Sequence, residues 1–442
     1  MNAREIAQTL EASIREGRLP PGARLPTHRD LAYRYGVALN TATRAMRILA
    51  ERGLVAGEVG RGSFVRAPGR PDSEALRIEQ DTPSLIDLTG NVMSLPSLAE
   101  RFEAATVTVL RRQRHALTDY QPHAGRHEDR AAAAAWLARR GGLPNDPART
   151  IICAGAQHAV MVALMATTRP GDAVAVEALT WPGIKAVAAA LRLNLVPVAI
   201  DDQGLRPRAL QQAAIRHRIT ALYCMPDLHN PTSAVMTARR RELVAALARR
   251  LDFAVIEDDA YGFLTDQALP PLAALAPERV WYVRSTSKAM LPALRAAWML
   301  APSGQEQRAA DLVRATVWMA PPLGAAVASL WIADGTAAAL EVEKRREANA
   351  RQQMVAAAFP AEWGRSTHPF SMHFWLNLPD GLRAADAVGA ALEAGVRIAP
   401  GRAFAIQGAP NAIRLALGRP LHREDLAEAL RRLLNAWGRG AA

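Results

Sequence analysis

The stretch VWYVRSTSKAMLPALR, residues 280–295, begins as an apolar run and continues with small hydroxyl residues around a lysine. Its first part, Val280–Arg284, has the composition of a buried β-strand. A lysine after such a strand is placed for amine chemistry, because its amino group can form a Schiff base with the carbonyl of a cofactor. Ser285 and Arg295 would supply hydrogen-bond donors for a phosphate. Lys288 is therefore a candidate catalytic residue, although a single lysine in a loop is usually only solvated.

Similar apolar runs alternate with helical patterns on both sides of this stretch. Buried β-runs separated by helices are typical of an α/β domain with a mostly parallel sheet. After Ser303 the chain is first helix-rich and then contains short β-runs, which indicates a smaller C-terminal α+β subdomain. The expected strands are Thr150–Cys153, Ala173–Glu177, Leu195–Ala199, Ala221–Met225, Ala254–Glu257 and Val280–Arg284, then Met372–Leu378, Val396–Ala399 and Ala412–Ala416; the expected helices include Ala156–Thr168, Trp181–Leu191 and Ala238–Leu251.

Other residues near these elements suit a pyridine-type cofactor. Asp258, at the end of an apolar run, can keep a pyridinium nitrogen protonated, which makes the ring an electron sink. Tyr261 and Asn230 suit a ring oxygen as hydrogen-bond partners. Each also has an ordinary explanation, because an acidic residue after a strand is often a cap and Asn-Pro often forms a turn.

Three further positions suit the rest of such a ligand. Gly155-Ala156-Gln157 opens a helix after a strand, and the backbone N–H groups at such a helix start bind phosphate. Trp181 offers a face for ring stacking, and Arg414 can hold a carboxylate through two parallel hydrogen bonds. Taken singly, a core tryptophan and a salt-bridged surface arginine are the more ordinary explanations.

Residues 1–66 instead predict three helices and a β-hairpin, which together make a winged helix-turn-helix. Apolar residues recur every four positions over residues 2–16, and a glycine follows where the first helix should end. A glycine turn at residues 60–62 separates two short β-runs. The expected elements are a helix over 2–16, a helix over His28–Tyr35 capped by Thr27, a third helix capped by Asn40 or Thr41 and running to about Arg52, and strands Leu54–Glu58 and Ser63–Arg66.

Charge and the third predicted helix both point to DNA. The chain has a net charge of +12, and residues 1–70 contribute half of it, with twelve arginines against six acidic residues. A basic surface attracts polyanions, although arginine is the usual cation throughout this chain, which has only three lysines. The third helix would meet base edges, the second would contact phosphate, and the hairpin tip would reach phosphate or a minor groove. The candidate DNA-binding residues are Arg29, Asn40, Thr41, Thr43, Arg44, Arg47, Gly60 and Arg61.

Residues 4–66 resemble the DNA-binding domain of GntR-type bacterial regulators. One departure affects base recognition: such domains usually carry Ser/Thr-Arg before the Asn-Thr pair, whereas this chain has Ala38-Leu39, so Arg44 or Arg47 would have to substitute. The resemblance rests on Ile14, Gly17, Leu19, Pro21-Gly22, Leu25-Pro26, Arg29, Leu31-Ala32, Gly36-Val37, Asn40-Thr41, Leu49, Gly53-Leu54, Gly60, Gly62 and Phe64-Val65.

Residues 85–438 resemble the class I/II aminotransferases, which are fold-type-I proteins that bind pyridoxal phosphate. The resemblance implies that Lys288 is the Schiff-base lysine, that Asp258 pairs with the pyridine nitrogen and that Arg414 receives the α-carboxylate of an amino acid. The substrate cannot be read, because Gly90-Asn91 and Arg126–Arg130 depart from the family pattern. The resemblance also implies that Asn230 and Tyr261 contact the ring's 3-oxygen, that Trp181 replaces the usual stacking tyrosine or phenylalanine, that Ala156, Gln157, Ser285 and Arg295 hold the phosphate, and that Tyr120 reaches the phosphate of a neighbouring subunit.

A winged helix followed by an aminotransferase-like domain resembles the MocR-type subfamily of GntR regulators, which implies a cytoplasmic, head-to-tail homodimer. We expect a winged helix over residues 1–66, a linker over 67–84, a large cofactor-binding domain over 85–302 and a helical stretch with a small subdomain over 303–442. In the favoured hypothesis the protein is a transcription regulator whose large domain binds pyridoxal phosphate and senses it or an amino compound. In the alternative it is a working aminotransferase with an attached DNA-binding module.

Composition excludes several other classes. The apolar runs are too short for a membrane-spanning helix, and the charged N-terminus does not fit a secretory leader. Two cysteines, Cys153 and Cys224, are too few for a disulfide framework or a zinc finger, so we expect buried thiols and no metal.

Overall fold

The computed structural model describes residues 1–15, 18–20, 22–51, 54–58, 62–65, 85–265, 269–359, 363, 365–366 and 368–438. The chain forms two compact units, Met1–Glu74 with Gln407–Ala409, and Ala75–Ile406 with Pro410–Ala442. The predicted linker at 67–84 lies outside the described residues, as do Gly60 and Arg61.

The N-terminal unit is a small helical core with a hairpin. Helices α1 (Ala3–Arg15), α2 (His28–Tyr35) and α3 (Leu39–Glu51) precede the antiparallel strands β1 (Val55–Glu58) and β2 (Gly62–Val65). Thr27 caps α2 as expected, with Asp30 completing the capping box. The predicted cap of α3 is wrong, because the carbonyl of Ala38 already accepts from the N–H groups of Thr41 and Ala42. Asn40 and Thr41 therefore lie in the first turn of the helix.

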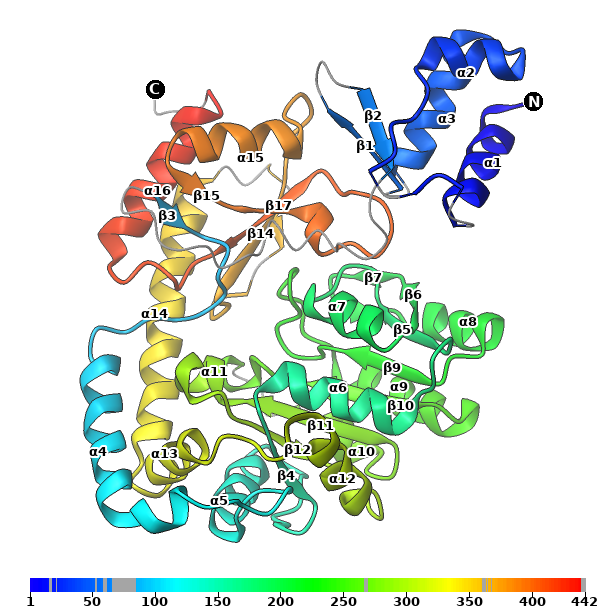
Figure 1. Cartoon of the computed structure of the whole chain (residues 1–442). Coiled ribbons are helices and arrows are strands. Elements are labelled where there is room, and N and C mark those ends of the chain that lie inside the picture. The colour runs from blue at the N-terminus through cyan, green and yellow to red at the C-terminus, as the bar shows by residue number, and fades with distance from the viewer. Residues whose placement is uncertain are drawn as a thin grey trace. The chain divides into compact units, whose positions relative to one another are not determined.

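A seven-stranded sheet forms the centre of the second unit, as predicted for an α/β domain (Figure 1). Only β12 is antiparallel to its neighbours among the described strands of this sheet. The antiparallel strand was not predicted. The strand order is β4 (Thr150–Cys153), β12 (Ala297–Leu300), β11 (Val280–Ser285), β10 (Ala254–Asp258), β9 (Ala221–Cys224), β5 (Ala173–Glu177) and β6 (Asn194–Val198).

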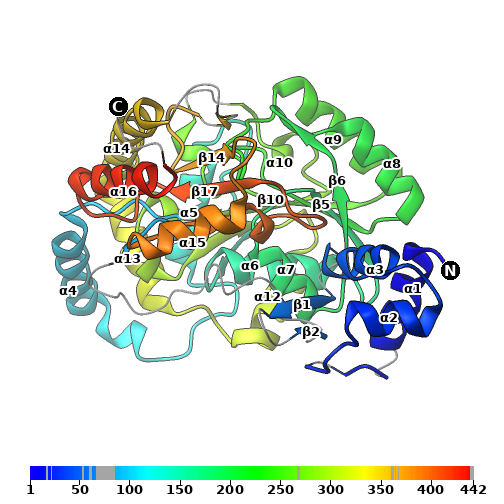
Figure 2. The same ribbon diagram turned by 90° about the horizontal axis from the view of Figure 1, so that it is seen from above.

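Alternate side chains of each strand face two separate cores, because the strand period is two. On β11, for example, Tyr282 belongs to one core and Trp281 and Val283 to the other. Helices α8 and α9 lie side by side over the first face (Figure 2). The first face is covered by α4 (Leu98–Leu117), α5 (His127–Ala138), α8 (Pro207–His217), α9 (Ala238–Leu251), α10 (Leu272–Leu275) and α13 (Pro322–Ala333), and the second by α6 (Ala156–Thr167), α7 (Gly183–Ala190) and α12 (Glu306–Val317).

A smaller antiparallel sheet packs against α15 (Ala384–Glu393) and α16 (Arg423–Ala436). The long helix α14 (Thr336–Ala358) joins the two sheets, because its Leu340 is buried in the large core and its Val355 in the small one (Figure 1). The small sheet has the order β13 (Arg365–Ser366), β14 (His373–Asn377), β17 (Ala412–Ala416) and β16 (Ala399–Pro400). Two short pairs are β3 (Ile86–Asp87) with β15 (Val396–Arg397) and β7 (Ile200–Asp201) with β8 (Gly204–Leu205).

Two packing details differ from the sequence prediction. Helices α12 and α13 follow residue 302, where the prediction divides the large domain from the smaller one, yet their buried side chains belong to the cores of the large sheet. Helix α7 begins at Gly183, so Trp181 precedes it.

No single helix in the described part of the chain is long and apolar enough to cross a membrane. Helices Pro322–Ala333 and Thr336–Ala358 are long and apolar enough only when they are taken together, and they are bent by 85° relative to each other.

Candidate functional site

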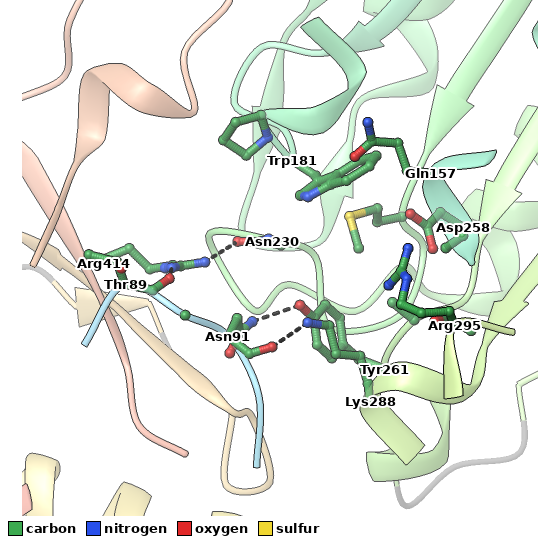
Figure 3. A pocket seen from close by; sticks show the side chains of 16 residues that line it. Thr89, Asn91, Gln157, Trp181, Asn230, Asp258, Tyr261, Lys288, Arg295 and Arg414 are labelled. Carbon is green, nitrogen blue, oxygen red and sulfur yellow. Dashed lines mark hydrogen bonds between the residues drawn. The ribbon is translucent and has the colours of Figure 1, made fainter. Parts of the chain in front are cut away.

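A pocket of about 270 Å³ lies at the carboxyl ends of the parallel strands, where ligands bind in open α/β sheets. Its volume is near the lower end of the usual range for small-ligand pockets. Segments after β4, β5, β9, β10 and β11 line one side, and residues from the smaller subdomain line the other (Figure 3). The pocket is lined by Thr89, Gly90, Asn91, Ala156, Gln157, Trp181, Pro182, Met225, Asn230, Asp258, Ala260, Tyr261, Ser285, Lys288, Arg295 and Arg414.

Lys288 projects into the pocket from the short helix α11 (Thr286–Ala289), which directly follows β11. Its amino group donates a hydrogen bond to the backbone carbonyl of Asn91 (Figure 3). Burial disfavours the ammonium form and lowers the pKa of Lys288 to about 8, with Arg414 acting in the same direction and Asp258 opposing it. The amine is therefore closer to its nucleophilic neutral form than an exposed lysine.

Asp258 ends β10 and is fully buried. Its Oδ2 atom accepts a 2.7 Å hydrogen bond from the Tyr223 hydroxyl, and its Oδ1 atom has no hydrogen-bond partner among the described residues. Burial raises the pKa of this carboxyl to about 6. A buried carboxylate oxygen without a donor is an unfavourable arrangement that a ligand N–H would relieve.

The phosphate-binding residues expected from the sequence gather at the start of α6. Gly155 caps this helix with φ of +91°, a conformation that favours glycine. A Cβ atom at Gly155 would lie 2.5 Å from a guanidinium nitrogen of Arg295. Arg295 therefore packs closely against the start of α6, and this close approach is possible because residue 155 has no Cβ atom. Ser285 lines the same pocket. Backbone N–H groups and a guanidinium suit a phosphate.

Trp181 and Arg414 form two further walls of the pocket. The Trp181 ring lies 6.4 Å from the Tyr223 ring, and a Cβ atom on Gly183 would strike it at 2.0 Å. The buried Arg414 donates to Oδ1 of Asn230 at 3.3 Å and to the carbonyl of Thr89. Burial lowers the pKa of Arg414 to about 10.

The structure thus brings every predicted pocket residue together except one. Tyr120 is 77% exposed and lies outside the pocket, with its ring 5.9 Å from that of Trp318. Its predicted contact with a neighbouring subunit involves a second chain. Residues that the sequence reasoning did not single out are Tyr223 and His373, which sit inside apolar strands, so the strand pattern gave no signal of their polar contacts.

The pocket fits the pyridoxal phosphate that the sequence implies. The unpartnered Asp258 oxygen suits the pyridine N–H, and the glycine-lined space beside Arg295 suits the phosphate. Lys288 lines the same pocket (Figure 3). No group of three potential metal-ligating side chains occurs in the part of the chain that is described.

The N-terminal unit presents most of the predicted DNA-binding residues on its surface. Asn40, Thr43, Arg44 and Arg47 are exposed on α3, and Thr41 is half-buried there. Arg29 is exposed in the first turn of α2. Ala42, Ala45 and Leu49 of α3 are fully buried, so the helix turns its polar face outward.

Comparisons with known proteins agree with both halves of this description. Residues 83–433 match the aminotransferase class I and II family, and residues 2–65 match the gntR family of bacterial regulatory proteins. The chain is 27% identical to the HTH-type transcriptional regulator YdeF of Bacillus subtilis (strain 168), covering 97% of this chain and 94% of YdeF.

Two further comparisons concern enzymes. The chain is 30% identical to the 2-aminoadipate transaminase of Thermus thermophilus, covering 81% of this chain and 91% of the transaminase. The solved structure of LysN, the alpha-aminoadipate aminotransferase of Thermus thermophilus complexed with N-(5'-phosphopyridoxyl)-L-leucine, superposes with a TM-score of 0.74 at 25% identity, covering 88% of this chain and 96% of LysN.

Proposed function

The chain belongs to the aminotransferase class I and II family and carries a gntR-family domain, and we propose that it is a DNA-binding transcription regulator that uses its aminotransferase-like pocket as a sensor. Pyridoxal phosphate, alone or together with an amino compound, is the proposed ligand. The observation that carries the proposal is the presence, in one chain, of an exposed polar face on α3 and a pocket with Lys288 and an unpartnered Asp258 oxygen.

The cofactor, when bound, supplies an aldehyde that condenses with amines and a ring that accepts electrons. The chain's own residues would hold it. The amine of Lys288 would be its attachment point, and Asp258 would accept the hydrogen bond of the ring nitrogen. Arg295 and the first N–H groups of α6 would bind the phosphate. Arg414 would hold the carboxylate of an amino compound, and Asn230, which accepts a hydrogen bond from Arg414, would contact the ring's 3-oxygen together with Tyr261.

Regulation requires that the ligand bind one conformation of the protein more tightly than another. We propose that the protein acts as a head-to-tail homodimer in the bacterial cytoplasm, with Tyr120 of each copy completing the phosphate site of the other. Occupancy of the two pockets would then bias how two copies of α3 meet two half-sites on DNA. The similarity to YdeF, a transcriptional regulator by name, extends over most of both chains and supports the proposal that this protein is a regulator.

Binding to DNA tests the proposal directly. The purified full-length protein would be titrated against the intergenic DNA upstream of its own gene, at stated salt, with and without pyridoxal phosphate and a panel of amino acids. A scrambled fragment of equal length is the control. We expect sequence-specific binding whose affinity changes by about 5-fold or more, a change on the order of typical allosteric couplings, when pocket ligands are added. Absence of specific binding under all conditions would contradict the regulator assignment.

A second candidate function is transamination. The pocket keeps Lys288, Asp258 and Arg414 together, and the chain is 30% identical to a transaminase over most of its length. Keto-acid production that continues over many turnovers with an amino-acid panel would favour this candidate. A single stoichiometric change per protein molecule would favour the sensor.

A further inference from the structure

A buried histidine of the smaller sheet contacts Asn91, one of the residues that line the pocket. His373, on β14, is fully buried, and its Nε2 atom lies 3.1 Å from the backbone carbonyl of His229. A carbonyl oxygen can only accept a hydrogen bond, so Nε2 must carry the hydrogen and donate it. The remaining question is the state of the other ring nitrogen, Nδ1.

The neutral imidazole fixes the role of that nitrogen. Burial, together with the positive charge of Arg414, lowers the pKa of His373 to about 3, so the ring carries one hydrogen near neutral pH. Because Nε2 holds this hydrogen, Nδ1 has a free lone pair and accepts. Its partner, 2.9 Å away, is the side-chain amide of Asn91. The amide must therefore turn its NH₂ group, and not its oxygen, toward His373.

The same NH₂ group carries a second hydrogen, and it meets Tyr261. The Asn91 Nδ2 atom lies 2.7 Å from the Tyr261 hydroxyl oxygen (Figure 3). Since the amide nitrogen can only donate, the phenolic oxygen accepts on this side. The hydroxyl hydrogen of Tyr261 is consequently free to point elsewhere, and Tyr261 lines the pocket. The His229 carbonyl thus determines, through two side chains, the direction of one phenolic hydrogen.

We propose that Asn91 and His373 are positioning residues that aim the Tyr261 hydroxyl hydrogen at the 3-oxygen of the bound cofactor ring. The inference rests on the proposed binding of pyridoxal phosphate. Asn91 precedes the large domain's first helix, His373 belongs to the small sheet, and Tyr261 follows β10 of the large sheet. The hydroxyl is therefore aimed correctly only when the small subdomain is seated against the large one.

The arrangement has a measurable electronic consequence. A hydrogen bond donated to the ring oxygen draws negative charge from it, which weakens that oxygen's attraction for a proton on the cofactor-linked nitrogen of Lys288. The other charged groups facing Lys288 are Asp258, Arg414, Arg295 and Lys344, and the proposed variants leave all four in place. Loss of the aimed hydroxyl should therefore let this nitrogen hold its proton to a higher pH.

The experiment follows the visible absorbance of pyridoxal phosphate bound to the full-length protein as a function of pH. We expect Asn91→Ala to raise the midpoint of the spectral titration by about one pH unit, the scale of one hydrogen bond to a charged group. Asn91→Leu, which keeps the number and branching of the side-chain heavy atoms, should do the same, so the test survives if the alanine variant folds poorly. His373→Leu should shift the midpoint in the same direction, and the matched control Asn194→Ala, at the exposed end of β6, should not.

A double-mutant cycle separates positioning from general damage. Tyr261→Phe removes the hydroxyl itself, so adding Asn91→Ala to it should produce no further shift. Equal midpoints for Tyr261→Phe and the double variant would support the inference. Additive shifts, or a wild-type midpoint in both Asn91 variants, would overturn it. If the wild-type protein itself shows no lysine-bound cofactor band, the proposed cofactor binding fails instead, which is a different and recognisable result.

Discussion

Tyr223 donates a 2.7 Å hydrogen bond to one oxygen of Asp258 and leaves the other oxygen unpartnered at the pocket. The two residues lie on the neighbouring strands β9 and β10, whose register aligns Tyr223 with Ile256. The tyrosine thus fixes the orientation of the carboxylate but forms a hydrogen bond with only one of its two oxygens. A carboxyl held in this way is prepared for a ligand N–H and is destabilising while the pocket is empty.

The unfavourable burial of the Asp258 carboxylate predicts that the free energy of unfolding of the cofactor-free protein depends on pH through this residue. The pKa of Asp258 is about 6 in the folded protein, above its ordinary value near 4. The folded protein therefore binds this proton more tightly than the unfolded chain. The favourable contribution is fully present below about pH 4 and is lost as pH rises through about 6.

We expect Asp258→Asn to become more stable relative to the wild type between about pH 4 and pH 8, by up to about 3 kcal/mol. Urea unfolding of both cofactor-free proteins at several pH values measures the difference. Asp202→Asn, at an exposed aspartate, should show the same pH dependence as the wild type. A constant difference between the Asp258 variant and the wild type at all pH values would contradict the assigned pKa.

The strands of the large sheet were largely predictable. Thr150–Cys153 and Ala173–Glu177 of the large sheet, and Ala412–Ala416 of the small sheet, have the expected bounds because buried strands appear in the sequence as short apolar runs. The antiparallel β12 was not, since its direction depends on pairing with β11 and β4, which are distant in the chain.

The pocket was predictable only where a residue type carries its chemistry with it. Lys288, Asp258 and Arg414 stand out because a lysine, an acid and an arginine in apolar surroundings need an explanation. His373 and Tyr223 do not stand out, because each lies inside an apolar run that is already explained as a buried strand. Their roles depend on hydrogen bonds across 144 and 35 residues of chain, which no local pattern reveals.

Replacement of Lys288 tests the attachment point of the cofactor. We expect Lys288→Ala to lose the visible absorbance band of lysine-bound pyridoxal phosphate, because the amine that forms the bond is gone. Absorbance spectra after dialysis against the cofactor measure this. The chain has two other lysines, and Lys185→Ala, on α7 outside the pocket, is the matched control that should keep the band. An unchanged spectrum in Lys288→Ala would assign the attachment to another residue.

Gly155→Ala tests the phosphate end of the pocket. The new methyl group would lie 2.5 Å from a nitrogen of Arg295, so the arginine has to move away from the phosphate site. We expect the affinity for pyridoxal phosphate to fall about tenfold, which corresponds to the loss of one charge-assisted hydrogen bond. Fluorescence titration of the cofactor measures the dissociation constant.

The matched control for Gly155 is Gly171. Its φ of +94° is nearly the same, but an added Cβ would meet no atom within 4 Å. Gly171→Ala therefore introduces the same backbone strain without disturbing Arg295. Equal losses of cofactor affinity in the two variants would mean that strain, and not the arginine, is responsible.

The exposed arginines of α3 test the DNA-binding assignment. We expect Arg44→Ala and Arg47→Ala each to weaken binding to the upstream DNA by about 1–3 kcal/mol if the side chain contacts a base edge. A contact to phosphate would instead lower affinity for all sequences and make binding less dependent on salt. Fluorescence anisotropy with specific and scrambled duplexes at several salt concentrations separates the two cases. Arg383→Ala, an exposed arginine of the large unit paired with Asp386, is the control. Unaltered binding in both α3 variants would contradict the assignment of α3 as the recognition helix, since Ala38-Leu39 stands where Ser/Thr-Arg is usual and Arg44 or Arg47 is expected to supply the missing contact.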